Sequence, residues 1–92
     1  MRQTCYTYLM YYLYVLKCAD GTLYTGIALD VKRRVVEHNT SDKLGARYTR
    51  SRRPVYLVYQ TPAGDESAAK SEEYRFKQLS RVAKLALLKK RK

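Results

Sequence analysis

Residues 11–18, Tyr-Tyr-Leu-Tyr-Val-Leu-Lys-Cys, constrain the fold more than any other part of this chain. The run is short and rich in aromatic and β-branched residues, a composition typical of a β-strand. Because it is apolar on both faces, we expect the strand at the centre of a sheet. The segment Ala19–Thr22 supplies a turn, and Leu23–Leu29 predicts a second strand that completes a hairpin.

The length of the hairpin loop decides which side chains share a face of the sheet, because side chains alternate along a strand. A two-residue turn would place Tyr14 and Tyr24 on opposite faces. A three-residue loop with Gly21 at a positive-φ position would instead pair Leu16 with Tyr24. Both phenols would then lie on the same face. A pocket shared by the two tyrosines therefore requires the odd-length loop.

Further elements are predicted after the hairpin. Asp30 and Ser80 are suited to cap the N-termini of the first and last helices. The segments are a helix over Val31–His38, a polar and basic stretch over Thr40–Arg53, a strand over Val55–Thr61, a loop over Pro62–Asp65, a helix over Glu66–Leu79 and a helix over Arg81–Leu88. The order β-β-α-β-α-α predicts an α+β fold, a small three-stranded antiparallel sheet flanked by helices.

The chain of 92 residues is expected to form a single domain, 1–92, with a core over about residues 10–88. Residues 1–9 are interpreted as a leader and residues 89–92 as a solvated basic tail. No apolar run reaches membrane-spanning length. Cys5, Cys18 and the single histidine cannot form a four-ligand zinc site, and free thiols are expected in a reducing cytoplasm.

The charge of the chain points to a polyanionic partner. It has 19 Lys and Arg against 8 Asp and Glu, a net charge of +11. Such an imbalance favours contact with nucleic acid, although it says nothing about chemistry. The expected contact residues include arginines interleaved with an aromatic side chain, a combination used in nucleic-acid grooves. They are Arg33, Arg47, Tyr48, Arg50 and Arg53; solvated charge is the simpler interpretation of such a cluster.

Two tripeptides lie on the hairpin strands, Leu13-Tyr14-Val15 and Tyr24-Thr25-Gly26. With Arg34 and His38 on the following helix and Glu73 on the later one, they resemble the GIY-YIG nuclease superfamily. The segments Lys43–Arg50 and Leu79–Leu85 look like its small standalone bacterial subfamily. Leu13 stands where the family has glycine, and Thr25 where it has an aliphatic residue.

The resemblance implies roles for five residues: Tyr14 as general base, Tyr24 as an orienting group, Arg34 and His38 on one helical face, and Glu73 as the metal ligand. The residue types suit phosphodiester hydrolysis. A carboxylate is a hard oxygen ligand for Mg²⁺ or Mn²⁺, and the small number of acids favours one divalent ion over two. Arginine grips phosphate bidentately. An unperturbed phenol is a poor base at neutral pH, so Tyr14 needs help, with His38 able to take the proton onward.

The sequence therefore predicts a metal-dependent endonuclease that hydrolyses DNA, with RNA as an alternative substrate. Two rival hypotheses stay open: a nucleic-acid-binding module that no longer cuts efficiently, and a subunit whose target is supplied by a partner protein. Residue by residue, simpler interpretations also exist. Tyr14 and Tyr24 could be ordinary strand aromatics, and Glu73 could pair with Lys77 at i+4 on an exposed helix face.

Overall fold

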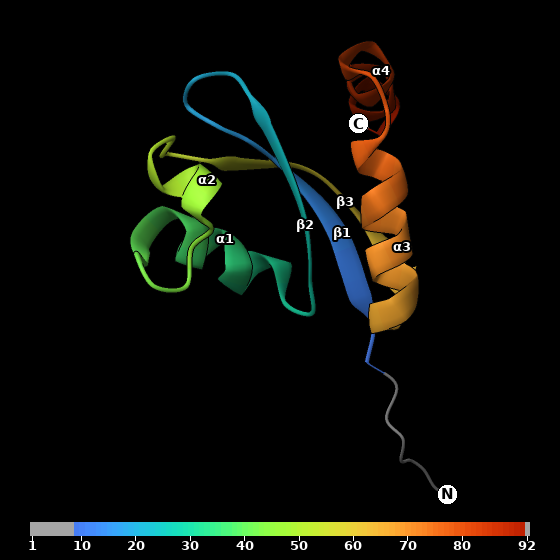
Figure 1. Ribbon diagram of the computed structural model, residues 1–92, viewed down its shortest axis with the longest axis horizontal. Coiled ribbons are helices and arrows are strands. Elements are labelled where there is room, and N and C mark those ends of the chain that lie inside the picture. Colours follow the sequence, from blue (N-terminus) through green and yellow to red (C-terminus); the bar gives the residue numbers. More distant parts are fainter. Residues whose placement is uncertain (1–8, 92) are drawn as a thin grey trace, which may run out of the picture.

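The computed structural model describes residues 9–91 of the chain (Figure 1). The predicted leader lies outside the described residues except for Leu9, and so does Lys92. The elements are β1 (Tyr11–Lys17), β2 (Leu23–Ala28), α1 (Val31–Thr40), α2 (Arg47–Arg50), β3 (Tyr56–Gly64), α3 (Glu66–Lys77) and α4 (Arg81–Arg91).

The three strands form one antiparallel sheet in the order β2-β1-β3. β1 lies at the centre, as its two-sided apolar pattern predicts, and Leu13, Tyr14, Val15 and Leu16 are all buried. The predicted α+β class and the three-stranded antiparallel sheet are confirmed.

The hairpin has the odd-length loop. The backbone N–H of Cys18 donates to the Thr22 carbonyl at 2.8 Å, and the intervening Gly21 has a φ of +86°. This φ lies in the left-handed region, which glycine adopts without a steric penalty. The register pairs Leu16 with Tyr24, as predicted, so Tyr14 and Tyr24 point to the same face.

The third strand is longer than predicted. Residues 62–65 were expected to form a loop, but β3 continues through Pro62 to Gly64. This prediction was wrong because β3 is an edge strand, where a proline lacking an N–H can be accommodated. Two register irregularities in the pairing with β1 accompany the extension.

Helices cover both faces of the sheet: α1 and α2 lie on one side, and α3 and α4 on the other (Figure 1). Each face has its own cluster of buried residues. The α3 side holds Leu13, Val15, Ala63, Ala69 and Phe76, and the α1 side holds Tyr14, Leu16, Cys18, Val31 and Val55. Side chains alternate along β1, and the strand therefore contributes to both clusters.

The helix starts agree with the sequence, but some ends do not. The carboxylate of Asp30 accepts from Arg33 N at 3.1 Å, and Ser80 Oγ accepts from Ala83 N at 3.1 Å, so both predicted caps are present. α1 runs to Thr40, two residues further than predicted, and α3 ends at Lys77, two residues earlier than predicted. α4 continues to Arg91, so the expected basic tail is helical over residues 89–91. Lysine and arginine are good helix formers and favour a helix C-terminus, which explains this correction.

The short helix α2, within the stretch expected to be irregular, was not predicted. Its N-terminal residue Ala46 makes no side-chain cap, and four residues offer no apolar periodicity. The turn is held by contacts from elsewhere: Arg50 donates to the Asp42 carbonyl at 2.8 Å, and Arg52 donates to the Tyr48 carbonyl at 2.9 Å.

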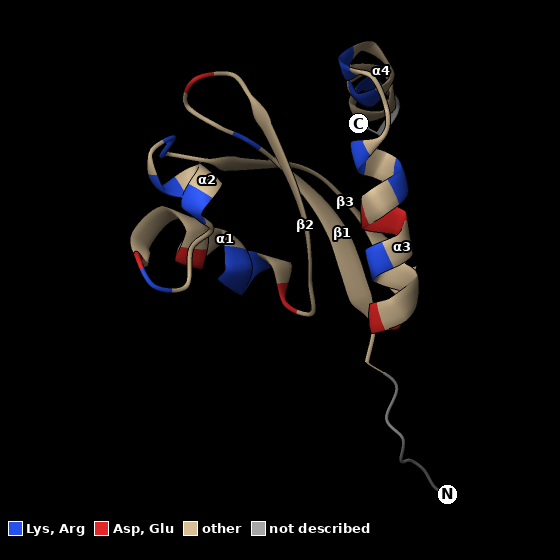
Figure 2. Ribbon diagram, in the orientation of Figure 1, with Lys and Arg blue, Asp and Glu red and all other residues tan. Residues whose placement is uncertain are grey.

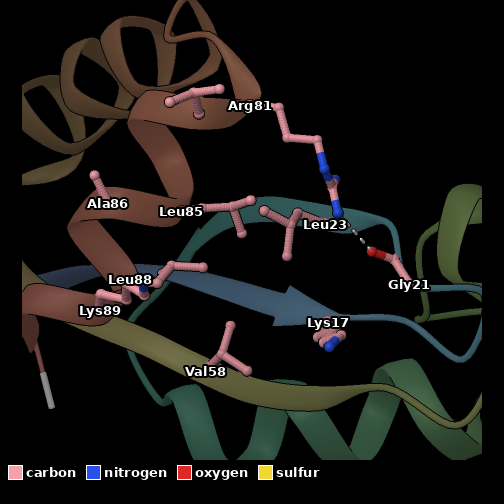
Figure 3. A pocket seen from close by; sticks show the side chains of 10 residues that line it. Lys17, Gly21, Leu23, Val58, Arg81, Leu85, Ala86, Leu88 and Lys89 are labelled. Carbon is pink, nitrogen blue, oxygen red and sulfur yellow. Dashed lines mark hydrogen bonds between the residues drawn. The ribbon is translucent and has the colours of Figure 1, made fainter.

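Helix α4 covers the far end of the sheet above a cavity of about 650 Å³ (Figure 3). Leu85 and Leu88 face Leu23 and Val58 across it, while Arg81 reaches toward the hairpin loop. α4 is therefore positioned by a few apolar contacts and by its N-terminus, and this places its first turn beside the β1–β2 loop.

Candidate active site

The centre of the site is a hydrogen bond between Tyr14 and His38. The Tyr14 hydroxyl lies 2.8 Å from His38 Nε2, and both side chains are almost fully buried. Tyr14 comes from the central strand and His38 from the last turn of α1, where its position seven residues after the buried Val31 turns it toward the sheet. The two residues that the sequence placed on separate elements are thus in direct contact.

A second hydrogen bond fixes the orientation of the imidazole. His38 Nδ1 lies 2.9 Å from Thr49 Oγ1, and that hydroxyl donates to the Ala46 carbonyl at 3.0 Å. Because the Thr49 hydroxyl donates its proton to the Ala46 carbonyl, its oxygen acts as an acceptor toward the imidazole. We therefore assign the neutral tautomer of His38 with the proton on Nδ1, donating to Thr49. The backbone N–H of Ala46 also makes a long hydrogen bond to Nδ1, at 3.4 Å, and the shorter one to Thr49 decides this assignment. Nε2 then accepts the proton of Tyr14.

Sequence reasoning missed Thr49, which is fully buried on α2 between arginines. Neither its neighbours nor its spacing from His38 signals a contact. Only the packing of α2 against α1 brings the hydroxyl to the imidazole.

Burial shifts the pKa values of both partners. It raises the pKa of Tyr14 to about 12; Tyr24 and Glu73 add to the rise, while Arg34 opposes it. Burial also lowers the pKa of His38 to about 4, with Arg34 and Arg53 acting in the same direction and Glu37 against it. At neutral pH the pair is therefore an un-ionised phenol donating to an un-ionised imidazole.

The buried neutral histidine predicts acid-sensitive stability. The pKa of His38 falls from 6.5 to about 4 on folding, so its contribution is fully present above pH 6.5 and is lost as the pH falls toward 4. The loss should approach about 3 kcal/mol of unfolding free energy. Urea denaturation at pH 7 and at pH 4.5 measures it. His38 is the only histidine in the chain, so His38→Gln is the matched control. An equally steep pH dependence in that variant would refute the assignment.

Gly26 accommodates the ring of Tyr14. The two residues are paired across β1 and β2, and a Cβ at position 26 would meet the Tyr14 hydroxyl oxygen at 2.6 Å and Cζ at 2.7 Å. Such separations do not occur between unbonded atoms, so any side chain here would push the phenol away from His38. The last residue of the second tripeptide is a glycine for this steric reason.

Gly26→Ala should therefore uncouple Tyr14 from His38 and lower the unfolding free energy by about 1–3 kcal/mol, the usual cost of overpacking a core. A double-mutant cycle with Tyr14→Leu tests this, because leucine lacks the atoms that the new methyl would meet. In the Tyr14→Leu background the added cost of Gly26→Ala should shrink by more than half. Two fully additive costs would show that the glycine serves the backbone alone.

Arg34 faces the same phenol from α1. Its Nη1 donates to Glu37 Oε1 at 2.9 Å and to the Leu44 carbonyl at 2.6 Å, and its side chain is 28% exposed. Burial acts to lower the pKa of Arg34, but Glu37 and Tyr14 outweigh it and the pKa is raised. The guanidinium is thus held permanently charged beside Tyr14, with one edge near solvent.

Glu73 approaches from α3, on the other layer of the molecule. Its side chain is 24% exposed and pairs with Lys77 Nζ at 3.1 Å, the i+4 contact that the simpler interpretation predicts. Its charge nevertheless contributes to raising the pKa of Tyr14. The contact that this carboxylate makes is the ion pair with Lys77, and its influence on Tyr14 is the weakest of those that act on the phenol. The adjacent Glu72 is exposed and pairs with Arg75.

Tyr24 extends the site toward the surface. Its ring lies 5.2 Å from that of His38 and 5.8 Å from that of Tyr48, where the rings stack. Arg52 covers the Tyr48 ring at 4.0 Å and forms an ion pair with Asp20 at 3.0 Å. The aromatic side chains thus form a continuous row from the buried histidine to a half-exposed tyrosine.

The residues predicted to contact nucleic acid differ in solvent exposure and in the hydrogen bonds that they make within the fold. Arg33 is 75% exposed, with an ion pair to Glu37 at 3.3 Å. Arg53 is used within the fold: it donates to the His38 carbonyl at 2.7 Å and to the Ser41 carbonyl at 3.0 Å, and pairs with Asp42. Figure 2 shows Lys and Arg on α1, on α2 and in the adjoining loops, and also along α3 and α4. Arg47 and Arg50 on α2 are exposed there.

The donor set fits one hard cation better than a cluster. Within residues 9–91, no three His, Cys, Asp or Glu side chains lie together as a metal-binding group. Glu73 offers a single, partly exposed carboxylate. One carboxylate with waters and a substrate phosphate is an ordinary arrangement for Mg²⁺. Within the described residues, Glu73 thus offers a single carboxylate, a donor compatible with one Mg²⁺ or Mn²⁺.

A tyrosine-bearing hairpin, an arginine on the next helix and a glutamate on a later helix define the class of this domain. The family model described as the GIY-YIG catalytic domain matches residues 10–86, and the chain therefore belongs to the GIY-YIG family. Membership of this family suggests a nuclease-type function and implies nucleic acid as the substrate class.

Its relatives are small proteins of the UPF0213 group. The chain is 56% identical over 79 residues to a UPF0213 protein of Desulfotalea psychrophila, covering 86% of this chain and 71% of that one. It is 53% identical over 78 residues to one from Halobacterium salinarum, covering 85% and 99%. The solution structure of a UPF0213 protein from Bacillus halodurans has a TM-score of 0.55 at 40% identity, covering 87% and 83%. These findings confirm the resemblance seen in the sequence.

In the part of the chain that the structure describes, no helix combines the length and the apolar character that crossing a membrane requires.

Proposed function

We propose that this protein is a metal-dependent endonuclease that hydrolyses phosphodiester bonds of DNA, acting as a single domain in the cytoplasm. The observation that carries the proposal is the buried Tyr14–His38 hydrogen bond, with the charges of Arg34 and Glu73 acting on the same phenol. A phenol used only for packing would not need a buried acceptor and a neighbouring cation acting on it.

In the proposed reaction a water oxygen attacks the phosphorus atom, the bond from phosphorus to the leaving sugar oxygen breaks, and that oxygen takes a proton from solvent. The water gives its proton to the Tyr14 oxygen while Tyr14 passes its own proton to His38 Nε2. Thr49 holds the imidazole in the tautomer that can accept this proton. Tyr14 is never required to ionise in advance, which its pKa of about 12 would disfavour at neutral pH.

The low pKa of His38 makes the imidazole a poor proton acceptor, and binding of the substrate would raise this pKa. Arg34 and Arg53 contribute to lowering this pKa. An anionic phosphate bound against Arg34 would offset that charge and make His38 more basic at the moment it is needed. Arg34 would also stabilise the negative charge that builds on the non-bridging oxygens. Tyr24, in contact with His38, would orient the water.

Glu73 would hold one Mg²⁺ or Mn²⁺, which when bound supplies charge stabilisation at the phosphate. Lys77 now pairs with this carboxylate, so metal binding replaces one cation by another with higher charge. The exposed residues Arg33, Arg47 and Arg50, together with Tyr48, would contact the DNA backbone.

The test is cleavage of supercoiled plasmid and branched DNA by the purified protein with Mg²⁺ or Mn²⁺, and with a chelator. Cleavage that depends on added metal supports the endonuclease. Tight, salt-dependent binding of DNA without cleavage under any metal would replace this proposal by the binding module. Cleavage that appears only after a second protein is added would indicate the partner-dependent subunit.

A further inference from the structure

A smaller cavity adjoins the aromatic row, between the end of the hairpin, α2 and α4. Its volume is about 250 Å³, and its lining combines two cations with an aromatic ring and an aliphatic side chain. The lining residues are Thr22, Leu23, Tyr48, Arg81 and Lys84. The sequence assigns no role to Arg81 or Lys84, which lie in the segment Leu79–Leu85 and come from the first turns of the last helix.

The two cations of this cavity have no carboxylate partner among the described residues. None of the ion pairs within residues 9–91 includes Arg81 or Lys84. Arg81 makes one long hydrogen bond, from Nη2 to the Gly21 carbonyl at 3.4 Å (Figure 3), and Lys84 lies 5.8 Å from the Phe76 ring. Two unneutralised charges at the mouth of one cavity favour an anionic ligand.

The position of the cavity relates this anion to the active site. Tyr48 forms one wall, and its ring stacks on Tyr24, which in turn contacts His38. The Tyr48 ring already packs against Tyr24 and Arg52, so it is a fixed wall and not a mobile side chain. A DNA strand whose scissile phosphate lies beside Tyr14 would meet this cavity as it leaves the site.

We propose that this cavity is a subsite for an unpaired nucleotide next to the cleaved bond, with Arg81 and Lys84 binding its phosphate and Leu23 and Tyr48 contacting its sugar and base. The inference rests on the proposed nuclease function. A cavity of about 250 Å³ has room for one sugar-phosphate unit, and the proposed subsite therefore calls for a strand that is unpaired on this side of the cut. Aromatic walls with cations are the usual means of holding single strands.

Binding to a fluorescent single-stranded oligonucleotide and to a blunt duplex, as a function of salt, tests the subsite. All proteins carry Glu73→Ala and are studied without metal, so that no cleavage occurs. Each phosphate contact with a single strand contributes about 0.7 to the slope of log affinity against log salt. Lys84→Gln with Arg81→Gln should lower the slope by about 0.7 for the single strand, because both cations bind one phosphate, and Lys84→Gln alone should lower it by part of that amount. Neither should change duplex binding.

The matched control is Lys70→Gln, which removes an equal charge from an exposed position on α3, away from this cavity. Thermal unfolding checks that both variants remain folded, because Arg81→Gln loses the contact with Gly21 and Lys84→Gln loses the contact with the Phe76 ring. Equal losses in Lys84→Gln and Lys70→Gln, or equal losses for single strand and duplex, would overturn the subsite. If the wild type does not cleave DNA but Lys84→Gln still weakens single-strand binding selectively, the nuclease proposal is refuted and the subsite is retained.

Discussion

Glu73→Ala should lower metal-dependent cleavage of DNA by at least about 1,000-fold, the largest effect expected of any substitution in this protein. A metal that stabilises charge in the transition state is worth several kcal/mol, and each 1.4 kcal/mol is a factor of ten in rate. Glu73 is the carboxylate whose charge acts on Tyr14, and removing it should abolish metal binding there. Single-turnover cleavage with saturating Mg²⁺ measures the loss, and calorimetry with Mn²⁺ measures metal affinity directly.

The substitution should leave the fold intact. The Glu73–Lys77 pair is partly exposed, and such pairs contribute at most about 1 kcal/mol. Glu72→Ala is the matched control, because it removes a neighbouring exposed carboxylate that also pairs along α3. It should retain nearly full cleavage and metal affinity. Cleavage that survives Glu73→Ala would place the metal elsewhere or reveal a contaminating nuclease, and the proposed site would be abandoned.

Tyr14→Phe should reduce the cleavage rate by about 100- to 10,000-fold, the range usual for loss of a general acid–base group. Phenylalanine keeps the ring beside Gly26 but cannot pass a proton to His38. Because Tyr14 is not expected to bind the phosphate, the affinity for DNA should be unchanged. The imidazole loses its buried partner, which should cost about 1–3 kcal/mol of unfolding free energy.

Tyr12→Phe controls for the loss of a phenol from this strand. Tyr12 lies two residues earlier on β1, on the same face, and packs against the same cluster. It should cut DNA at the wild-type rate. The His38→Gln variant adds a second check. Its cleavage rate should fall by about as much as that of Tyr14→Phe, and the double variant should be little slower than either single variant. Full activity in Tyr14→Phe would show that the phenol serves packing.

The sheet and the pairing of its strands could be predicted because they follow from local sequence. The two-sided apolar run makes β1 central, and Gly21 permits the loop that sets the register. That register alone places Tyr14 and Tyr24 on one face. The caps at Asp30 and Ser80 are equally local, since each hydrogen bond spans three residues.

Other features could not be predicted because they depend on segments that meet only in the folded chain. The extension of β3 through Pro62 depends on which strand lies at the edge, and α2 exists through hydrogen bonds from neighbouring arginines. Arg53 looked like a nucleic-acid contact, yet its guanidinium binds carbonyls at the end of α1. The sequence alone does not show whether a charged side chain will form hydrogen bonds with water, with the backbone or with a ligand.

By itself, the sequence determined the hairpin, the sign of the charge and the residue types that suit phosphodiester chemistry. Only the tertiary structure decided that His38 is buried and neutral between Tyr14 and Thr49, and that α4 carries two cations to a cavity beside Tyr48. Backbone pairing and capping are set over a few residues. Burial, protonation and charge balance are set by whatever the fold packs around a group, and those neighbours lie far away along the chain.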